Sequence, residues 1–414
     1  MVRSGSLCLH ANDRDPLSEA DLSSIWAGQR FPPAALQAQD GRRLRVLNPG
    51  RPNSGSGPDF RDAVLELDGQ QVCGDVELHV RASFFRSHGH NLDHAYDSVA
   101  LHVVYLADEG AETRLSDGRA APVASFAPWL LGRAEELQGW LTAPPLWQDP
   151  CRSAAARLGD AGVVEVLRRA GAARFEARVA RLRSDTAREG EEQALWTWML
   201  DSLGVGGDRQ GFRRLALAFP AALARLVFDA ARTEGWLSAA LLAVAGLGEP
   251  PEAVAALLPR PLAPAIVRTG RPLNWPERRL AALAALFGRA DGRLAACVME
   301  SVGQAGKARQ LLAAWQVAGT SGGPSLLGRE RAQELLVNVV LPFAAVHEGL
   351  REKAGALLAE LPAAAAYGRT AFLESNLARA DAKRRVSSAV EQQGLLSLAE
   401  EWCRQGGCGR CPLS

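Results

Sequence analysis

The chain has 414 residues, of which 47% are hydrophobic and 22% are charged, and its 40 glycines and 23 prolines are spread along it. This composition is typical of a globular protein with two or three domains, and it excludes collagen, coiled coils and bulk disorder. The 47 Lys and Arg residues balance the 46 Asp and Glu residues. A formal net charge of +1 indicates neither a nucleic-acid nor a membrane partner. Evidence for such a partner must come from local groups of charged residues.

Targeting signals are weak along the whole chain. Residues 1–15 hold charged side chains and lack the apolar stretch of a secretory signal. The longest nearly apolar run, residues 236–247, is shorter than the roughly 20 residues that cross a bilayer. Seven irregularly spaced cysteines favour a reducing compartment over a secreted disulfide framework. We therefore expect a cytoplasmic protein without a membrane partner.

The first third of the chain alternates predicted strands with turns. Residues 18–29 predict a short helix with Ser18 and Asp21 as a capping pair. Residues 43–48 predict a strand, and the loop 49–58, rich in Gly, Pro and Ser, ends at Asp59. Residues 62–67 and 71–80 flank Asp68–Gly69, which favours a two-residue hairpin turn. Residues 82–98 predict a polar loop, and residues 99–106 predict a mostly buried strand.

From about residue 129 onward the hydrophobic period becomes helical. Gly- and Pro-rich breaks at residues 204–207, 248–251, 259–264 and 321–324 divide this region into helices without a regular repeat. The fold class predicted is α+β. A mixed β-sheet domain at residues 1–128 precedes a mostly helical region at residues 129–414.

Ionisable side chains are concentrated around the second hairpin strand. Strand alternation places Asp75, Glu77 and His79 on the face opposite Val76 and Leu78. His and acid residues recur up to residue 102, at positions 75, 77, 79, 88, 90, 93, 94, 97 and 102. Carboxylates with imidazoles suit Mg²⁺, Mn²⁺ or Zn²⁺, so the pattern predicts a divalent-metal site. The alternative is a solvated strand face followed by a polar loop, with His102 as a core histidine.

Several segments together resemble an uncharacterised bacterial family, the domain of unknown function 2851. The matching segments are NPGRPNSGSGPDF (48–60), GDVELHVRAS and HGHNLDHAYDSVALHVVY (within 74–105), RPLNWPERRLAALA (271–284), VNVVLPF (337–343) and CRQGGCGRCPL (403–413). This resemblance extends over most of the chain and implies no established activity.

A second resemblance is mechanistic. Pro58–Asp59, a hairpin and then Glu77-Leu78-His79 look like the PD-(D/E)XK nuclease signature with His in place of Lys. The resemblance implies that Asp59 and Glu77 hold a divalent metal, while His79 orients or activates water and His88 and His90 assist. Asp75 could replace either acid. Because neutral imidazole lacks the permanent charge of Lys, the substitution changes the third role to that of a base.

Three cysteines near the C-terminus form the second group. Cys403, Cys408 and Cys411 lie in a Gly-rich turn, and thiolates so spaced favour Zn²⁺ or an iron–sulfur cluster. Cys151 is the first candidate for a fourth ligand. Free thiols and a disulfide are the alternatives.

Arginine far exceeds lysine in this sequence. Arg81, Arg271 and Trp275 are candidates for nucleic-acid contacts, because arginine neutralises phosphates and an indole can stack on a base. Arginine-rich helix faces between residues 168 and 183 fit solvated surfaces with interspersed Glu at least as well. The sequence lacks a Walker A loop, a GxGxxG motif after a strand and a GxSxG elbow, which disfavours nucleotide-driven motors, dinucleotide dehydrogenases and α/β-hydrolases.

These patterns lead to three functional hypotheses. The leading one is a phosphodiesterase or nuclease that uses Mg²⁺ or Mn²⁺ at the acid and histidine site. The second is a non-catalytic module that binds nucleic acid or protein and whose His and acid groups are structural. The third is a zinc-dependent hydrolase of a small substrate that uses His79, His88 and His90.

Overall fold

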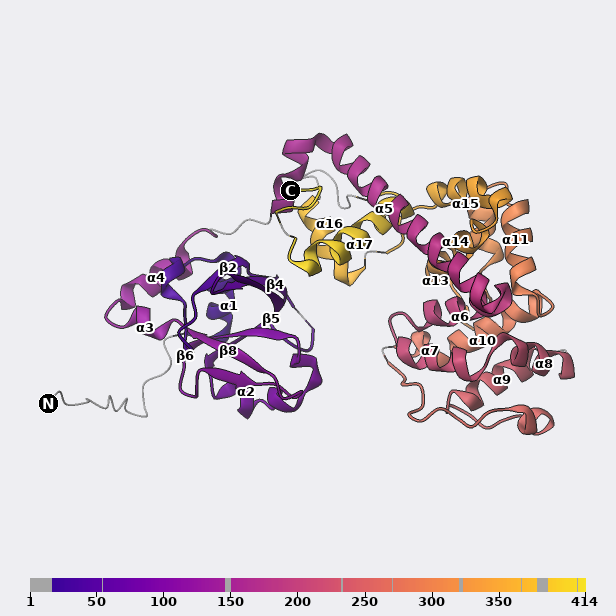
Figure 1. Cartoon of the computed structure of the whole chain (residues 1–414), viewed down its shortest axis with the longest axis horizontal. Helices are drawn as coiled ribbons and strands as arrows, with labels where there is room; N and C mark the ends of the chain where they lie inside the picture. Colours follow the sequence, from indigo (N-terminus) through magenta and orange to yellow (C-terminus); the bar gives the residue numbers. More distant parts are fainter. Residues whose placement is uncertain are drawn as a thin grey trace. The chain divides into compact units, whose positions relative to one another are not determined.

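The computed structural model describes residues 17–53, 55–145, 150–231, 234–269, 271–319, 323–365, 367–377, 386–407 and 409–414. Its internal contacts divide the chain into two compact units (Figure 1). Unit 1 comprises residues 1–159 and 398–414, and unit 2 comprises residues 160–397. The last strand, β8, ends at Ser125, and the elements described after it are helices joined by turns and two isolated β-bridges.

Unit 1 is built on a curled mixed sheet. Its strands are β1 (Gln37–Ala38), β2 (Leu44–Asn48), β3 (Arg51–Pro52), β4 (Phe60–Leu67), β5 (Gln70–Arg81), β6 (Val99–Leu106), β7 (Glu112–Arg114) and β8 (Ala120–Ser125). The order is β1-β8-β6-β5-β4-β2, with β3 paired to β4 and β7 paired to β8. The pairs β5–β6 and β6–β8 are parallel, and the other pairs are antiparallel.

The predicted helix and hairpin of unit 1 are confirmed. Helix α1 (Glu19–Gly28) begins after Ser18, whose side chain forms a capping box with Asp21. Strands β4 and β5 meet at Leu67 and Gln70 across Asp68 and Gly69. Both turn residues have positive φ, 48° and 82°, which is the conformation that an Asp-Gly hairpin turn favours.

The sheet separates an apolar core from a polar, yet buried, face. On one face Val76 and Leu78 pack with Leu22 and Trp26 of α1 and with Trp140 of α4 (Ala134–Thr142). On the other face the side chains of Asp75, Glu77 and His79 are also buried. The predicted alternation of apolar and ionisable side chains along β5 is therefore present. The ionisable face is buried, whereas the alternative interpretation required a face exposed to solvent.

The segment between β5 and β6 was expected to be a loop, and it contains three short helical turns. These are α2 (Phe84–Ser87), η2 (His90–Leu92) and η3 (His94–Tyr96). Phe85 and Tyr96 are buried and pack with Val99, Leu115 and Ala121 in a small apolar cluster. These two aromatic anchors hold the segment against the polar face of the sheet.

The remaining helices of unit 1 follow the sheet. They are α3 (Ala127–Leu130), α4 and the turn η4 (Pro150–Ser153), with η1 (Pro33–Ala35) before the sheet and η10 (Cys403–Gln405) near the C-terminus. Helix α5 (Ala154–Glu189) bends at Gly159, which has a φ of 69°, at the boundary between the units.

Unit 2 is all helical in the part that the structure describes, apart from its turns and bridges. Its helices surround one apolar core that includes Trp196, Phe212, Leu283 and Phe343. They are α6 (Glu191–Gly204), α7 (Arg209–Ala218), α8 (Ala221–Ala231), α9 (Glu234–Val244), α10 (Pro276–Arg289), α11 (Leu294–Gln304), α12 (Ala308–Ala314), α13 (Arg329–Leu335), α14 (Leu341–Ala344), α15 (Glu348–Glu360), α16 (Ala371–Leu377) and α17 (Ala389–Glu401), with the short turns η5 (Glu252–Leu257), η6 (Pro272–Asn274), η8 (Leu336–Val340) and η9 (Gly368–Thr370). Among the described residues, no helix combines the length and apolar character that crossing a membrane requires.

Candidate metal centre

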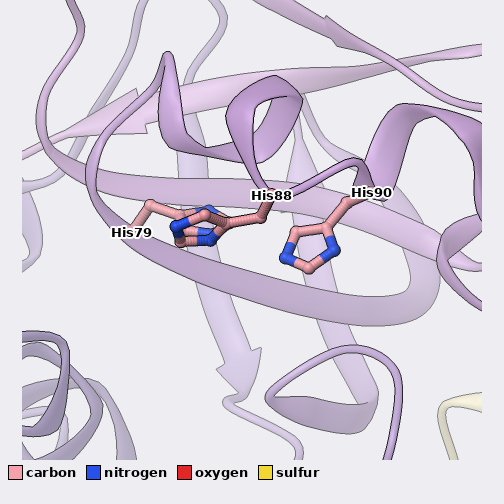
Figure 2. A group of neighbouring side chains, drawn as sticks. All are labelled: His79, His88 and His90. Carbon is pink, nitrogen blue, oxygen red and sulfur yellow. The ribbon is translucent and has the colours of Figure 1, made fainter.

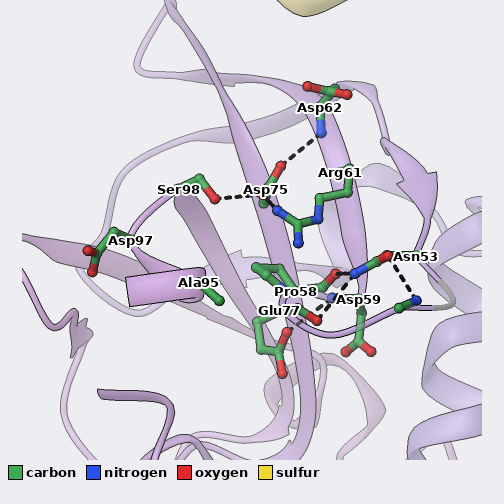
Figure 3. Close-up of polar contacts among 12 residues, drawn as sticks. Asn53, Pro58, Asp59, Arg61, Asp62, Asp75, Glu77, Ala95, Asp97 and Ser98 are labelled. Atoms are coloured by element: carbon green, nitrogen blue, oxygen red, sulfur yellow. Dashed lines mark hydrogen bonds and ion pairs between the residues drawn. The ribbon is translucent and has the colours of Figure 1, made fainter. Parts of the chain in front are cut away.

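The polar face of the sheet brings the predicted acids together at the start of β4 and the middle of β5. The backbone N–H of Asp59 donates to Oε2 of Glu77 over 3.1 Å, and the N–H of Leu78 donates to Oδ2 of Asp59 over 3.0 Å. Figure 3 shows both carboxylates on the same side of the strands. These reciprocal hydrogen bonds fix the two acids beside each other.

Three histidines join Glu77. The ligand atoms of His79, His88 and His90 all lie within 4.8 Å of one another, and Figure 2 shows the three rings gathered in one place. His79 Nε2 lies 3.2 Å from His88 Nδ1. Oε1 of Glu77 lies 3.7 Å from His79 Nε2 and 3.5 Å from His90 Nε2. The three histidines therefore form one candidate ligand group, and Glu77 lies beside two of them.

Aromatic contacts fix the imidazole rings from outside this group. The ring of His90 stacks on Tyr96 with the centroids 4.0 Å apart. The edge of Phe85 meets the rings of His79 and His90, with centroid distances of 6.1 and 5.4 Å. The two residues that anchor the segment between β5 and β6 thus also position the histidines.

The surroundings of Glu77 and Asp59 disfavour the charged forms of both carboxyl groups. Burial and the neighbouring Asp59 carboxylate together raise the pKa of Glu77 to about 8. Burial likewise raises the pKa of Asp59, and Glu19 at the start of α1 adds to the rise. Arg61 opposes the shift of Glu77 only weakly, because its Nη1 donates to Asp75 over 2.9 Å. A buried carboxylate without a strong cationic partner is costly, and a bound cation would remove that cost.

The histidines are in the state that a metal requires. Burial and the neighbouring His102, His90 and His88 together lower the pKa of His79 to about 2. Burial also lowers the pKa of His90. Neutral imidazole is the ligand form, so two of the three rings do not have to lose a proton before binding.

The ligand spacings fit a metal ion. A zinc ion about 2.1 Å from each ligand requires ligand–ligand distances of about 3.4 Å in a tetrahedron and about 3.0 Å in an octahedron. The 3.2 Å between His79 Nε2 and His88 Nδ1 lies between these values, and the 3.5 and 3.7 Å from Glu77 Oε1 to His90 and His79 are slightly longer. Three imidazoles and one carboxylate suit Zn²⁺ and Mn²⁺ better than Mg²⁺, which prefers oxygen ligands.

Asp75 lies apart from this group, although its side chain is also buried. Its carboxylate accepts hydrogen bonds from Arg61 Nη1, from the backbone N–H of Asp62 and from Ser98 Oγ (Figure 3). Asp62 has a φ of 55° and lies where the register between β4 and β5 shifts. Asp75 therefore stabilises a β-bulge.

His94 belongs to a separate, exposed group. Its Nδ1 lies 2.8 Å from Asp97 Oδ2 and 2.8 Å from Ser116 Oγ. Ser116 Oγ also donates to Asp97 over 2.7 Å. Both contacts of His94 use the same ring nitrogen, so the arrangement is a surface hydrogen-bond network and differs from a Ser-His-Asp triad.

The candidate nucleic-acid contacts are distributed over both units. Arg81 is half-buried at the end of β5 in unit 1. Arg271 and Trp275 flank η6 in unit 2, where Trp275 is 36% exposed and the Arg268 guanidinium lies 5.6 Å from its ring. In unit 2, Arg168 forms an ion pair with Glu391 at 3.1 Å.

Three of the four predicted thiol ligands can be placed, and Cys408 lies outside the described residues. Cys151 and Cys411 are buried, whereas Cys403 is half-buried. Their segments belong to unit 1, in which Arg157 donates to the backbone oxygen of Leu413. The thiol site therefore stays a prediction.

Sequence reasoning missed several residues around the centre. It left His102 undecided between a core and a functional role, although strand pairing sets this residue opposite Glu77. Tyr96, Phe85 and Glu19 carried no signal, because only the fold brings them to the site. Their contributions depend on packing between segments that no spacing rule connects.

The fold and the site define a protein with two parts. A mixed-sheet unit carries a candidate metal centre of histidine and acidic residues, and a helical unit follows it. Residues 19–254 match the family described as Protein of unknown function (DUF2851), and the chain belongs to this family. Comparisons with curated proteins and with solved structures gave no match.

Proposed function

We propose that this protein is a metal-dependent hydrolase that cleaves phosphodiester bonds in nucleic acid. The observation that carries the proposal is the group of His79, His88 and His90, whose ligand atoms all lie within 4.8 Å of one another, with Glu77 Oε1 3.7 Å from His79 Nε2 and 3.5 Å from His90 Nε2. A divalent ion at this point would polarise a phosphoryl oxygen and lower the pKa of a bound water.

The residues of the chain would divide the remaining tasks. The three histidines and Glu77 would hold the ion. Asp59, fixed by the N–H of Leu78, would orient the attacking water and accept its proton. In this arrangement His79 is a ligand rather than the base, since a group with a pKa of about 2 is a poor proton acceptor near neutral pH.

Two features favour a phosphodiester in a polymer as substrate. The first is the order of elements, a helix and then strands with Pro58-Asp59 before Glu77-Leu78-His79, which matches the order implied by the resemblance to PD-(D/E)XK nucleases. The second is access, because His88 is exposed and His90 is half-buried, so one side of the centre faces solvent. A long substrate can approach a centre of this kind.

A zinc-dependent hydrolase of a small substrate is the second candidate. The observation that favours it is the donor set, because three imidazoles with one carboxylate are typical of zinc sites. The same residues would act in the same way on a carboxylic or phosphoric ester, so the two candidates differ in substrate and not in mechanism.

The test is cleavage of labelled single- and double-stranded DNA and RNA in the presence of Mn²⁺ or Zn²⁺. The wild type is compared with Glu77→Ala and with the control Glu66→Ala, which removes a half-buried glutamate from the same hairpin. We expect cleavage by the wild type and the control, and a loss of at least about 100-fold in Glu77→Ala.

Parallel assays with bis(4-nitrophenyl) phosphate and 4-nitrophenyl acetate separate the candidates. Hydrolysis of these small esters without cleavage of nucleic acid would support the second candidate. If the wild type takes up metal and cleaves none of these substrates, both candidates are rejected in favour of a non-catalytic binding module.

A further inference from the structure

A buried chain of hydrogen bonds leads from the candidate metal centre through the sheet. His79 Nδ1 lies 3.0 Å from His102 Nε2, and His102 Nδ1 lies 2.7 Å from Thr113 Oγ1. His102 is 0% exposed, and Thr113 is buried on strand β7, which pairs with β8. At its outer end, the chain continues from His79 Nε2 to His88 Nδ1.

Each contact in this chain needs one donor and one acceptor, so the chain has two possible directions. In one direction His79 Nδ1–H donates to His102 Nε2, and His102 Nδ1–H donates to Thr113 Oγ1. His79 Nε2 then carries a lone pair that faces His88, His90 and Glu77. In the opposite direction Thr113 donates inward, and His79 Nε2 carries a hydrogen that blocks metal binding.

We propose that His102, supported by Thr113, is a positioning residue that holds His79 in the Nδ1–H tautomer and so directs the Nε2 lone pair at the metal centre. The inference rests on the metal site of the proposed function and is independent of whether that site hydrolyses a substrate. A hydrogen-bond acceptor behind a ligating histidine fixes the tautomer and the orientation of the ring.

The position of His102 fits this role. Strand β6 pairs in parallel with β5 and sets His102 opposite Glu77, so the sheet itself holds the acceptor behind His79. Phe85 packs on both rings, with centroid distances of 6.1 Å to His79 and 5.2 Å to His102. A hydroxyl can accept as readily as it donates, so Thr113 Oγ1 can accept from His102 Nδ1–H in the direction that the metal requires.

The experiment compares two substitutions of His102 in the full chain. His102→Phe fills the space without an acceptor, whereas His102→Gln restores an acceptor oxygen. Calorimetric titration measures the affinity of each variant for Zn²⁺. His90→Ala is the control, and the Zn²⁺ binding that it abolishes is assigned to this site. We expect His102→Phe to weaken Zn²⁺ binding by about 10- to 100-fold and His102→Gln to recover most of the loss.

Nitrogen NMR of ¹⁵N-histidine-labelled, metal-free protein supplies a readout that a purely structural role would not change. We expect Nδ1 of His79 to carry the hydrogen in the wild type and in His102→Gln, and the Nε2–H form to gain population in His102→Phe. If His102→Phe does not fold, Thr113→Val replaces it, with weaker Zn²⁺ binding and the same tautomer shift expected.

Two results would overturn the inference. One is a wild-type His79 that carries its hydrogen on Nε2 in the metal-free protein. The other is a folded His102→Phe variant that binds Zn²⁺ as tightly as the wild type. If the protein binds metal and hydrolyses nothing, the proposed function is rejected and this inference is not affected. The tautomer of His79 in the metal-free protein tests the inference without any metal.

Discussion

Glu77 has an unusual environment for a carboxylate. It is 4% exposed, it lies beside Asp59, and its nearest side-chain contacts include the nitrogens of His79 and His90. Neither ring is a cation near neutral pH, because burial lowers the pKa of both. A protonated Glu77 or a bound metal ion can satisfy this environment, and an ionised Glu77 alone cannot.

The first prediction concerns the pH dependence of stability without metal. The unfolded chain ionises Glu77 near its ordinary pKa of 4.5, whereas the folded chain retains the proton up to about pH 8. The stabilising contribution of the protonated form is therefore complete below pH 4.5 and is lost as the pH rises toward 8. We expect Glu77 to lower the free energy of unfolding by up to about 1.4 kcal/mol per pH unit across this window.

Urea denaturation at pH 5, 6.5 and 8 measures this effect as the difference between the wild type and Glu77→Gln. Glu66→Gln, on the same hairpin, is the control. Saturating Zn²⁺ should abolish the decrease in the wild type, because the ion stabilises the ionised carboxylate. Parallel pH profiles for the wild type and Glu77→Gln would contradict this account of Glu77.

The second prediction concerns Asp75, which the sequence pattern treats as equivalent to Glu77. Because three donors hold its carboxylate at the bulge near Asp62, Asp75→Asn should lower the free energy of unfolding by about 1 to 3 kcal/mol. Zn²⁺ affinity should change little, since no metal-centre residue contributes to this hydrogen-bond network. A loss of Zn²⁺ binding as large as that of Glu77→Gln, with unchanged stability, would instead make Asp75 a ligand.

At the scale of elements, the hairpin and its preceding loop position the acids. The indole N–H of Trp26 in α1 donates to the backbone oxygen of Pro49 over 2.8 Å, in a buried contact. Asn53 Nδ2 donates to the backbone oxygen of Pro58 over 2.9 Å. Helix α1 and the side chain of Asn53 thus hold the loop that delivers Asp59 to the start of β4.

The third prediction compares two glycines with the same backbone conformation. Gly50 and Gly69 have φ values of 84° and 82°, so alanine at either position costs about 1 to 2 kcal/mol in the left-handed region. A Cβ at Gly50 would lie 2.8 Å from the backbone oxygen of Arg61, whereas a Cβ at Gly69 would meet nothing within 4 Å. We expect Gly50→Ala to lower the free energy of unfolding by about 1 to 3 kcal/mol more than Gly69→Ala.

Chemical denaturation of both variants measures the difference. Zn²⁺ titration should show weaker binding in Gly50→Ala only, because the clash displaces the strand that begins beside Asp59. Equal destabilisation in the two variants would show that the loop is not packed against β4 in this way.

Local signals predicted the elements of unit 1 well where they were strong. The Ser18–Asp21 capping pair, the Asp68–Gly69 turn and the apolar run 99–106 each depend on neighbouring residues, and each is confirmed. The short helices after β5 could not be predicted, because Phe85 and Tyr96 hold them through packing with residues up to 36 positions away. The role of Asp75 was equally hidden, since alternation along a strand does not show a bulge in its partner.

At the scale of the whole molecule, the contacts assign the C-terminal segment to the sheet unit. Residues 398–414 belong to unit 1, and Gln71 Nε2 on β5 donates to the backbone oxygen of Gly406 over 3.2 Å. Hydrophobic periodicity could not predict this grouping, because it records only local sequence. The family match at residues 19–254 covers the strands of unit 1 together with part of the helical unit.

The most direct test of the metal centre is anomalous diffraction from crystals of the full chain grown with Zn²⁺ and, separately, with Mn²⁺. The account predicts one ion about 2.0 to 2.2 Å from His79 Nε2, His88 Nδ1, His90 Nε2 and Glu77 Oε1. Metal-saturated crystals in which ions lie only at the cysteines, or in which the three rings bind no ion, would contradict the central claim.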